Sequence, residues 1–281
     1  MKDILEEIVE NKRVELAIAV NEMPLEVIRR YALQKIRNDG APKIRSMKQS
    51  LAQSRSGIIA EFKRKSPSKG WIHADACVED VVPAYFANGA SAVSILTDEK
   101  YFGGRLDFIQ TARTAIFGDG CILRKEFIID EYQLYEARLV GADAVLLIAA
   151  DLLPAQYHDL LQTAHSLGLE VLLEVHDPSE LAYLGHGVPD MLGVNNRSLG
   201  TFHTDVQHSF DIAAQMQRAV ADLGLSADEA PVLVSESGIS SPEVVKRLRE
   251  AGFRGFLIGE CFMKESDPGK ALEKFIEEIE K

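Results

Sequence analysis

Eight short runs of apolar, mostly β-branched residues recur along this chain, and their spacing restricts the folds that it can adopt. Consecutive runs lie about 20 to 40 residues apart, which leaves room for a loop and a helix between them. The pattern predicts the βα units of a parallel sheet. The runs centre on Ile58-Ile59, Val93–Ile95, Ile122-Leu123, Val145–Ile148, Val171–Leu173, Leu192–Val194, Val232–Val234 and Phe256–Ile258.

Helical patterns fill several of the gaps. Proline near the first turn and glycine after the last turn are typical of helix ends, and both signals recur here. Four expected helices span residues 78–88, 131–140, 154–167 and 242–251, and each is followed by glycine. A fifth is expected over residues 207–223, within the long segment that follows the sixth run.

Eight such units in about 230 residues fit a (β/α)8 TIM barrel. A doubly wound open sheet is the alternative, but it usually has fewer strands and a G-x-G-x-x-G fingerprint after its first strand. Here the first run leads into Lys-Arg-Lys-Ser-Pro-Ser, without that fingerprint. We therefore expect residues 1–281 to form a single (β/α)8 barrel domain.

Residues 1–50 precede the first strand, and we expect them to form an N-terminal helical extension. Apolar residues from Ile4 to Val14 have amphipathic helical spacing, and further helices are expected over 24–38 and 43–53. The extension is expected to cap one barrel end or to cover the active site.

Composition narrows the class of partner. A net charge of -12 argues against nucleic acid or an anionic membrane, and no apolar run approaches the roughly 20 residues of a membrane span. The N-terminus has no signal region, and the scattered Cys77, Cys121 and Cys261 look like reduced thiols. We expect a cytoplasmic protein that is a monomer or a weak homo-oligomer and acts on a small molecule.

Polar side chains follow six of the expected strands, at the ends where barrel active sites lie. Charges within or just beyond apolar runs are costly unless they are paired or functional. Any one of them fits a solvated loop charge, but six strand ends together favour an active site. The candidates are Glu61 and Lys63, which share a strand face, then Lys125, Glu174, Asn195, Arg197, Glu236, Ser237, Gly238, Gly259 and Glu260.

Two of these strand ends favour a phosphate site. Small residues in Ser235–Ile239 and Ile258–Glu260 let backbone N–H groups approach an anion, and the last two loops are the usual phosphate cradle of a barrel. Phe102, Phe127, Leu146 and Leu199 are candidates for an aromatic-ring pocket, although each one alone fits ordinary core. The histidines lack metal-ligand spacing. Glu174-Val175-His176 comes nearest but has no evident third ligand, so no metal is expected.

These motifs together resemble the indole-3-glycerol-phosphate synthase family, whose motif order they follow over nearly the whole chain. The matching stretches are Ala60–Ser68, Ser94–Asp98, Tyr101–Gly104, Leu123–Ile128, Leu173–His176, Gly193–Arg197, Ser235–Ile239 and Leu257–Glu260.

The resemblance implies ring closure of 1-(2-carboxyphenylamino)-1-deoxyribulose 5-phosphate with loss of carbon dioxide and water, without metal or organic cofactor. It implies Lys125 as general acid and Glu174 as base, with Glu61 and Lys63 assisting dehydration. The division of acid roles between the two lysines stays open. By the same resemblance, Ser66, Phe102, Phe127, Asn195, Arg197 and Glu236 bind substrate, and Ser237, Gly238, Gly259 and the backbone of Glu260 hold its phosphate, helped by Lys63.

Two positions depart from the family pattern. The family more often has aspartate after the third-strand lysine, where this chain has Glu126, and the extra methylene is expected to affect how a carboxylate orients Lys125. Gly200 follows the sixth-strand motif and predicts a more mobile loop.

Other functions fit less well. Phosphoribosylanthranilate isomerase uses a cysteine base at the end of the first strand, where this chain has Glu61, and Cys77 lies beyond the loop. A fused double enzyme would need a second barrel. A non-catalytic phosphate-binding module would not need Glu61, Lys63, Lys125 and Glu174.

Overall fold

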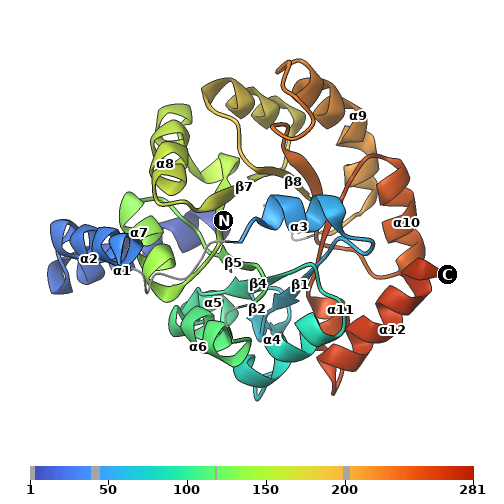
Figure 1. Ribbon diagram of the computed structural model, residues 1–281, viewed down its shortest axis with the longest axis horizontal. Helices are drawn as coiled ribbons and strands as arrows, with labels where there is room; N and C mark the ends of the chain where they lie inside the picture. The colour runs from blue at the N-terminus through green and yellow to red at the C-terminus, as the bar shows by residue number, and fades with distance from the viewer. Residues whose placement is uncertain (1–3, 39–44, 118, 199–202) are drawn as a thin grey trace.

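A computed structural model describes residues 4–38, 45–117, 119–198 and 203–281. In these ranges eight parallel strands close into a barrel, which confirms the expected (β/α)8 fold (Figure 1). The last strand pairs with the first, with Phe256 opposite Ile58. The barrel strands in chain order are β1 (Ile58–Phe62), β4 (Ala92–Leu96), β5 (Ile122–Lys125), β6 (Ala144–Ile148), β7 (Glu170–Val175), β8 (Met191–Asn195), β9 (Val232–Glu236) and β10 (Gly255–Ile258).

Helices surround the barrel and cover the outer faces of the strands (Figure 1). The five expected helices are present within two residues of their predicted ends. Between β7 and β8 the chain forms a 3₁₀ helix, η2 (Pro178–His186), that Asp177 and Glu180 cap reciprocally. The sequence patterns did not single out the helices over residues 107–115 and 268–280. The outer helices are α4 (Val78–Ala87), α6 (Asp107–Ala115), α7 (Glu131–Val140), α8 (Pro154–Ser166), α9 (Gln207–Ala221), α10 (Pro242–Glu250) and α12 (Pro268–Glu280).

The N-terminal extension serves both ends of the barrel. Its last helix, α3 (Met47–Gln53), closes the amino end, where Met47 and Leu51 pack against the barrel interior. The Ser46 hydroxyl donates to Glu170 Oε1 at the start of β7 (2.5 Å), which fixes α3 there. Part of the expected helix over 43–53, residues 43 and 44, lies outside the described ranges.

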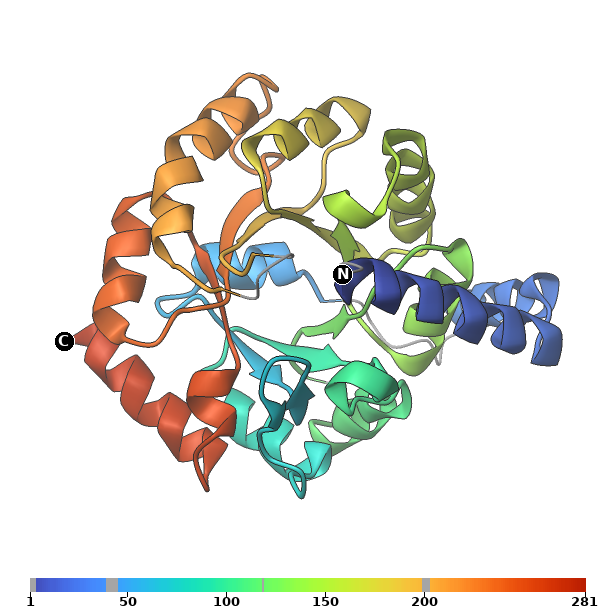
Figure 2. The same ribbon diagram turned by 180° about the vertical axis from the view of Figure 1, so that it is seen from behind.

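The first helix of the extension, α1 (Ile4–Glu22), lies across the opposite end of the barrel, and Figure 2 shows its N-terminal part near the barrel mouth. It forms a hairpin with α2 (Leu25–Arg37), which packs on α7. The last helix of the extension therefore caps one end of the barrel, and the first lies over the other end.

Several short helices and strands follow the carboxyl ends of the barrel strands. After β1, the two-residue strands β2 (Lys65–Ser66) and β3 (Gly70–Trp71) form a hairpin. The remaining elements are α5 (Glu99–Phe102), η1 (Ala149–Asp151) and α11 (Glu260–Met263). None of the helices in the described ranges has the length and apolar character needed to cross a membrane.

Candidate active site

Strand alternation brings the polar residues together inside the barrel mouth. Ile59, Leu123, Leu172 and Val234 pack in the barrel interior. Side chains two residues further along a strand point to the same face. The interior therefore changes from apolar to polar at its carboxyl end, where Glu61, Lys125, Glu174, Asn195 and Glu236 line one cavity.

The centre of this cavity is a buried lysine held between two carboxylates. Lys125 Nζ at the end of β5 lies 2.6 Å from Glu174 Oε2 and 2.7 Å from Glu236 Oε2. All three side chains are buried or nearly so. Burial alone would lower the pKa of Lys125, but the two carboxylates outweigh it and hold that pKa above its ordinary value. Lys125 is therefore an ammonium in the resting site.

The two carboxylates differ in their surroundings. Burial acts against ionisation of Glu174, yet Lys125, and then His176 with Nε2 3.3 Å away, lower its pKa below the ordinary range. Asn195 also donates to Glu174 Oε1 (3.1 Å). For Glu236, burial prevails over the attraction of Lys125 and raises the pKa. One ammonium stabilises one carboxylate, and the shared site favours the negative charge on Glu174.

This imbalance predicts a stabilising substitution. Because the pKa of Glu236 is higher in the folded protein, the folded state binds more protons than the unfolded state above the ordinary carboxyl pKa of about 4.3. Stability should therefore fall as pH rises through that window. Glu236→Gln should reduce this slope and raise the free energy of unfolding at alkaline pH, by about 1.4 kcal/mol for each unit of pKa difference. Urea denaturation from pH ~5 to ~9 measures it, and a variant less stable than wild type at the alkaline end would contradict it.

A second ion pair lies beside the first. Lys63 Nζ lies 2.5 Å from Glu61 Oε2, so the two side chains do share one face at the end of β1. Glu61 packs against the backbone of Gly259 at the end of β10, where an added Cβ would lie 2.2 Å from Glu61 Oε2. Glycine at 259 thus leaves the space that this carboxylate occupies.

A cationic hollow adjoins the cavity at the ends of β9 and β10. Ser237 has a left-handed backbone (φ 66°), which is uncommon for a residue other than glycine and marks a specialised loop. Arg197 Nη1 donates to Ser68 Oγ (3.0 Å), and Lys69 pairs with Glu260 (2.5 Å). The lining includes Lys63, Lys69, Arg197, Ser237, Gly238, Gly259, Glu260 and Lys264.

Sequence reasoning missed Lys69 and Lys264 in this hollow. Lys69 was visible in the loop after β1, but its role depends on the β2–β3 hairpin that turns the loop back toward β10. Lys264 follows α11 and has no local motif.

The other end of the cavity is apolar and aromatic. The rings of Phe102 and Phe127 lie 6.0 Å apart, and Ser66 of β2 and Leu146 also line this end. Three α1 residues, Ile4, Leu5 and Ile8, complete the wall. Leu199 and Gly200 lie outside the described residues.

The carboxylates paired with the Lys125 ammonium are Glu174 and Glu236, while Glu126 has other partners, so an effect of its longer side chain on Lys125 stays a prediction. The Glu126 carboxylate turns away from the barrel interior and accepts from Thr97 Oγ1 (2.7 Å) and the backbone N–H of Phe127 (2.9 Å). Strand alternation explains this, since neighbouring residues face opposite sides. Within the described ranges no group of three or more His, Cys, Asp or Glu side chains is arranged to hold a metal ion.

Solved structures with a similar fold include a tryptophan synthase α-subunit from Legionella pneumophila, with a TM-score of 0.59 and 13% identity over 83% of this chain and 98% of that one. Another is a 3-hexulose-6-phosphate synthase, with a TM-score of 0.58 and 11% identity over 78% and 97% of the two chains. At these identities the likeness concerns the fold alone.

Sequence comparison is more specific. A family model described as indole-3-glycerol phosphate synthase matches residues 5–275. A protein of that name from Bacteroides thetaiotaomicron is 56% identical over 280 residues, which cover 100% of both chains. One from a Polaromonas species is 39% identical over 272 residues and 97% of both chains. The chain belongs to the indole-3-glycerol phosphate synthase family.

Proposed function

We propose that this chain closes the indole ring of 1-(2-carboxyphenylamino)-1-deoxyribulose 5-phosphate, releasing carbon dioxide and water. It is a carboxy-lyase of tryptophan biosynthesis by its family. The observation that carries the proposal is the Lys125 ammonium between Glu174 and Glu236, with an aromatic wall on one side and a cationic hollow on the other. The substrate has an aromatic ring at one end and a phosphate at the other, which matches an apolar wall and a cationic hollow at the two ends of the site.

In the first step, the ring carbon that bears the carboxylate attacks the substrate ketone, and negative charge develops on the ketone oxygen. Lys125 is the proposed general acid for that oxygen. A lysine whose pKa is raised is a weak acid, so the ketone oxygen must take the place of a carboxylate around Nζ. The preorganised ammonium then stabilises the developing charge and supplies the proton.

Loss of carbon dioxide restores the aromatic ring, with the electron pair of the broken bond returning to it. The new hydroxyl then leaves as water. That step needs an acid at the hydroxyl and a base for the departing proton. We assign the base to Glu174, which is ionised at working pH, and the assistance in dehydration to Lys63 with its partner Glu61. Asn195 holds Glu174 in place.

Substrate binding divides between the two ends. Phe102, Phe127 and Ser66 are proposed to contact the carboxyphenyl part, and Glu236 and Arg197 the polar chain. The backbone N–H groups of Ser237, Gly238, Gly259 and Glu260 are proposed to hold the phosphate, with Lys63 supplying charge.

The direct test is formation of the fluorescent indole product from synthetic substrate by the purified chain. Turnover is expected to persist in the presence of EDTA, because Lys125 and the paired carboxylates supply the proton transfers. No product, or activity that chelator removes and a divalent metal restores, would contradict the proposal. Conversion of phosphoribosylanthranilate instead would assign the isomerase reaction.

Inorganic phosphate should compete with substrate, and Lys63→Met should raise its inhibition constant. The protein is strongly acidic overall, so anion binding depends on this local hollow, and it should weaken as ionic strength rises. Lys65→Met is the matched control, because Lys65 Nζ bonds the carbonyl of Lys100 instead (2.9 Å). Equal inhibition of wild type and Lys63→Met would place the phosphate elsewhere.

Glycine substitutions would be a poorer probe of this hollow. Gly238 has φ +75°, and a Cβ there would lie 2.7 Å from Thr204 Cγ2. Gly238→Val would therefore strain the loop whether or not phosphate binds there.

A further inference from the structure

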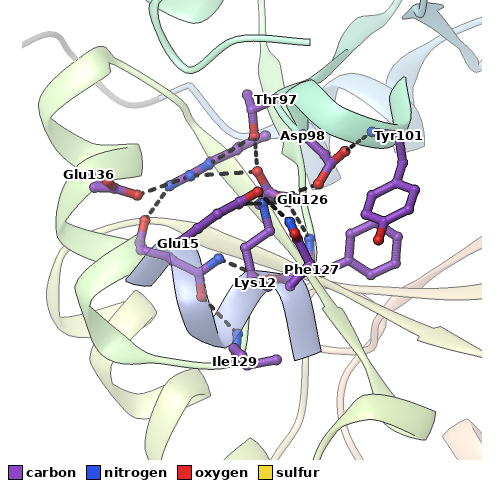
Figure 3. Close-up of polar contacts among 12 residues, drawn as sticks. Lys12, Glu15, Thr97, Asp98, Tyr101, Glu126, Phe127, Ile129 and Glu136 are labelled. Atoms are coloured by element: carbon purple, nitrogen blue, oxygen red, sulfur yellow. Dashed lines mark hydrogen bonds and ion pairs between the residues drawn. The ribbon is translucent and has the colours of Figure 1, made fainter. Parts of the chain in front are cut away.

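A lysine of α1 is almost fully buried beside the active site. Lys12 is 5% exposed, and it lies one turn beyond Ile8, which lines the apolar end of the cavity. Lysine is rarely buried unless it is paired. Lys12 Nζ lies 2.6 Å from Glu15 Oε2 on its own helix, and 3.2 Å from both Asp98 Oδ2 and Glu126 Oε1 (Figure 3).

Asp98 and Glu126 each shape a loop that carries one of the aromatic residues of the cavity. Asp98 Oδ1 accepts from the backbone N–H of Tyr101 (2.8 Å) and so caps α5, which ends at Phe102. Glu126 accepts from the backbone N–H of Phe127 (2.9 Å). The ammonium of Lys12 therefore joins α1 to the ends of both β4 and β5.

Two other contacts tie α1 to α5, but they lie nearer the surface. Tyr101 Oη donates to Glu7 Oε1 (2.9 Å), and Lys100 Nζ donates to Asn11 Oδ1 (2.9 Å). The Lys100–Asn11 contact is exposed and the Tyr101–Glu7 contact is only part-buried. Lys12 differs because both of its barrel partners, Asp98 and Glu126, are buried.

Lys12 stays charged in this setting. Burial alone would lower its pKa, but Glu126 and Asp98 outweigh burial and hold the pKa above its ordinary value. Lys12 is therefore an ammonium at neutral pH.

We propose that Lys12 is a positioning residue: it seats α1 on the ends of β4 and β5, so that Ile4, Leu5 and Ile8 close the apolar end of the cavity over the substrate ring. Lys12 does not itself line that cavity. This role rests on the proposed function for the identity of the ring, but the seating of α1 is a property of the free protein.

Loss of the ammonium would leave an unbalanced cluster. Asp98 and Glu126 would remain buried, with Arg124 as the nearby cation. Arg124 Nη2 is 3.9 Å from Glu126 Oε2 and is closer to Glu136 (3.0 Å), so it cannot serve both buried carboxylates well. Two poorly paired carboxylates beneath α1 would favour its release and the entry of water.

The test measures α1 seating and catalysis separately. In Lys12→Met, amide hydrogen exchange of residues 4–12 in the free protein should accelerate while the barrel strands stay protected. KM for the substrate should rise by about tenfold, with kcat changed by less than about threefold, because binding is lost rather than proton transfer. Arg13→Met, an exposed neighbour on the same helix, is the matched control and should resemble wild type.

Lys12→Arg keeps the positive charge, so its KM should stay much closer to the wild-type value than the KM of Lys12→Met. If Lys12→Met does not fold, Lys12→Met/Glu126→Gln removes one positive and one negative charge together and is measured instead. Unchanged exchange of α1, unchanged KM, or a fall in kcat alone would overturn the positioning role. Failure of wild type to form indole product would contradict the proposed function, while the exchange measurement would still decide the seating of α1.

Discussion

Lys125→Met is expected to lower kcat by about 10²–10⁴-fold, the range typical of a lost general acid. Methionine keeps most of the side-chain volume, so the barrel mouth should stay packed. It removes the only ammonium that lies between Glu174 and Glu236 in the described part of the chain. The ketone oxygen would then develop charge without a proton donor or a positive neighbour.

Steady-state kinetics with the fluorescent product measures this effect. Lys274→Met, on the exposed face of α12, is the matched control and should keep wild-type kcat. A folded Lys125→Met enzyme that retains about a tenth or more of kcat would remove Lys125 from the acid role. Circular dichroism and thermal unfolding separate loss of chemistry from loss of fold.

The barrel could be predicted because each of its units carries local signals. The runs at Ile58-Ile59 and Val171–Leu173 have strand character, and the helices before Gly89 and Gly141 end where glycine permits a left-handed turn. The site followed from the same periodicity, since a charge two residues beyond an interior position faces the interior at the strand end.

The structure around Lys12 could not be predicted in the same way. Its partners Asp98 and Glu126 are more than 80 residues away, and a lysine on an amphipathic helix usually lies on the solvated face. One signal was present: Lys12 follows Ile8 by four residues and so falls on the buried stripe of α1. A charge on that stripe requires a partner, but the sequence does not say which one.

The 3₁₀ helix η2 shows a different limit. Asp177 and Glu180 form a capping box and Pro178 occupies the first turn, which are the signals of an ordinary α-helix. Gly185 and Gly187 lie near its end, where helix propensity is low. The local start signals are compatible with either kind of helix.

Glu174→Gln should lower kcat by a factor similar to that of Lys125→Met, with KM changed by less than about threefold. The amide keeps the size of the side chain, so the shape of the cavity should persist. Its single oxygen can still accept from Lys125, but its NH2 group then faces the Asn195 amide that bonds Glu174 Oε1 in the wild type. The substituted amide cannot take up a proton, and its neutral charge leaves Glu236 as the principal anion beside Lys125. The Lys125 ammonium would then favour ionisation of Glu236.

Glu170→Gln is the matched control for this experiment. Glu170 lies at the opposite end of the same strand, where it accepts from Ser46 and the backbone N–H of Lys48. Its substitution should loosen α3 and lower stability, with kcat and KM retained. For Glu174→Gln, a rise in KM at unchanged kcat would make Glu174 a binding residue, and the base for dehydration would have to be sought at Glu61. Comparing substitutions at the two ends of β7 thus separates the contribution of this strand to the fold, at Glu170, from its contribution to the chemistry, at Glu174.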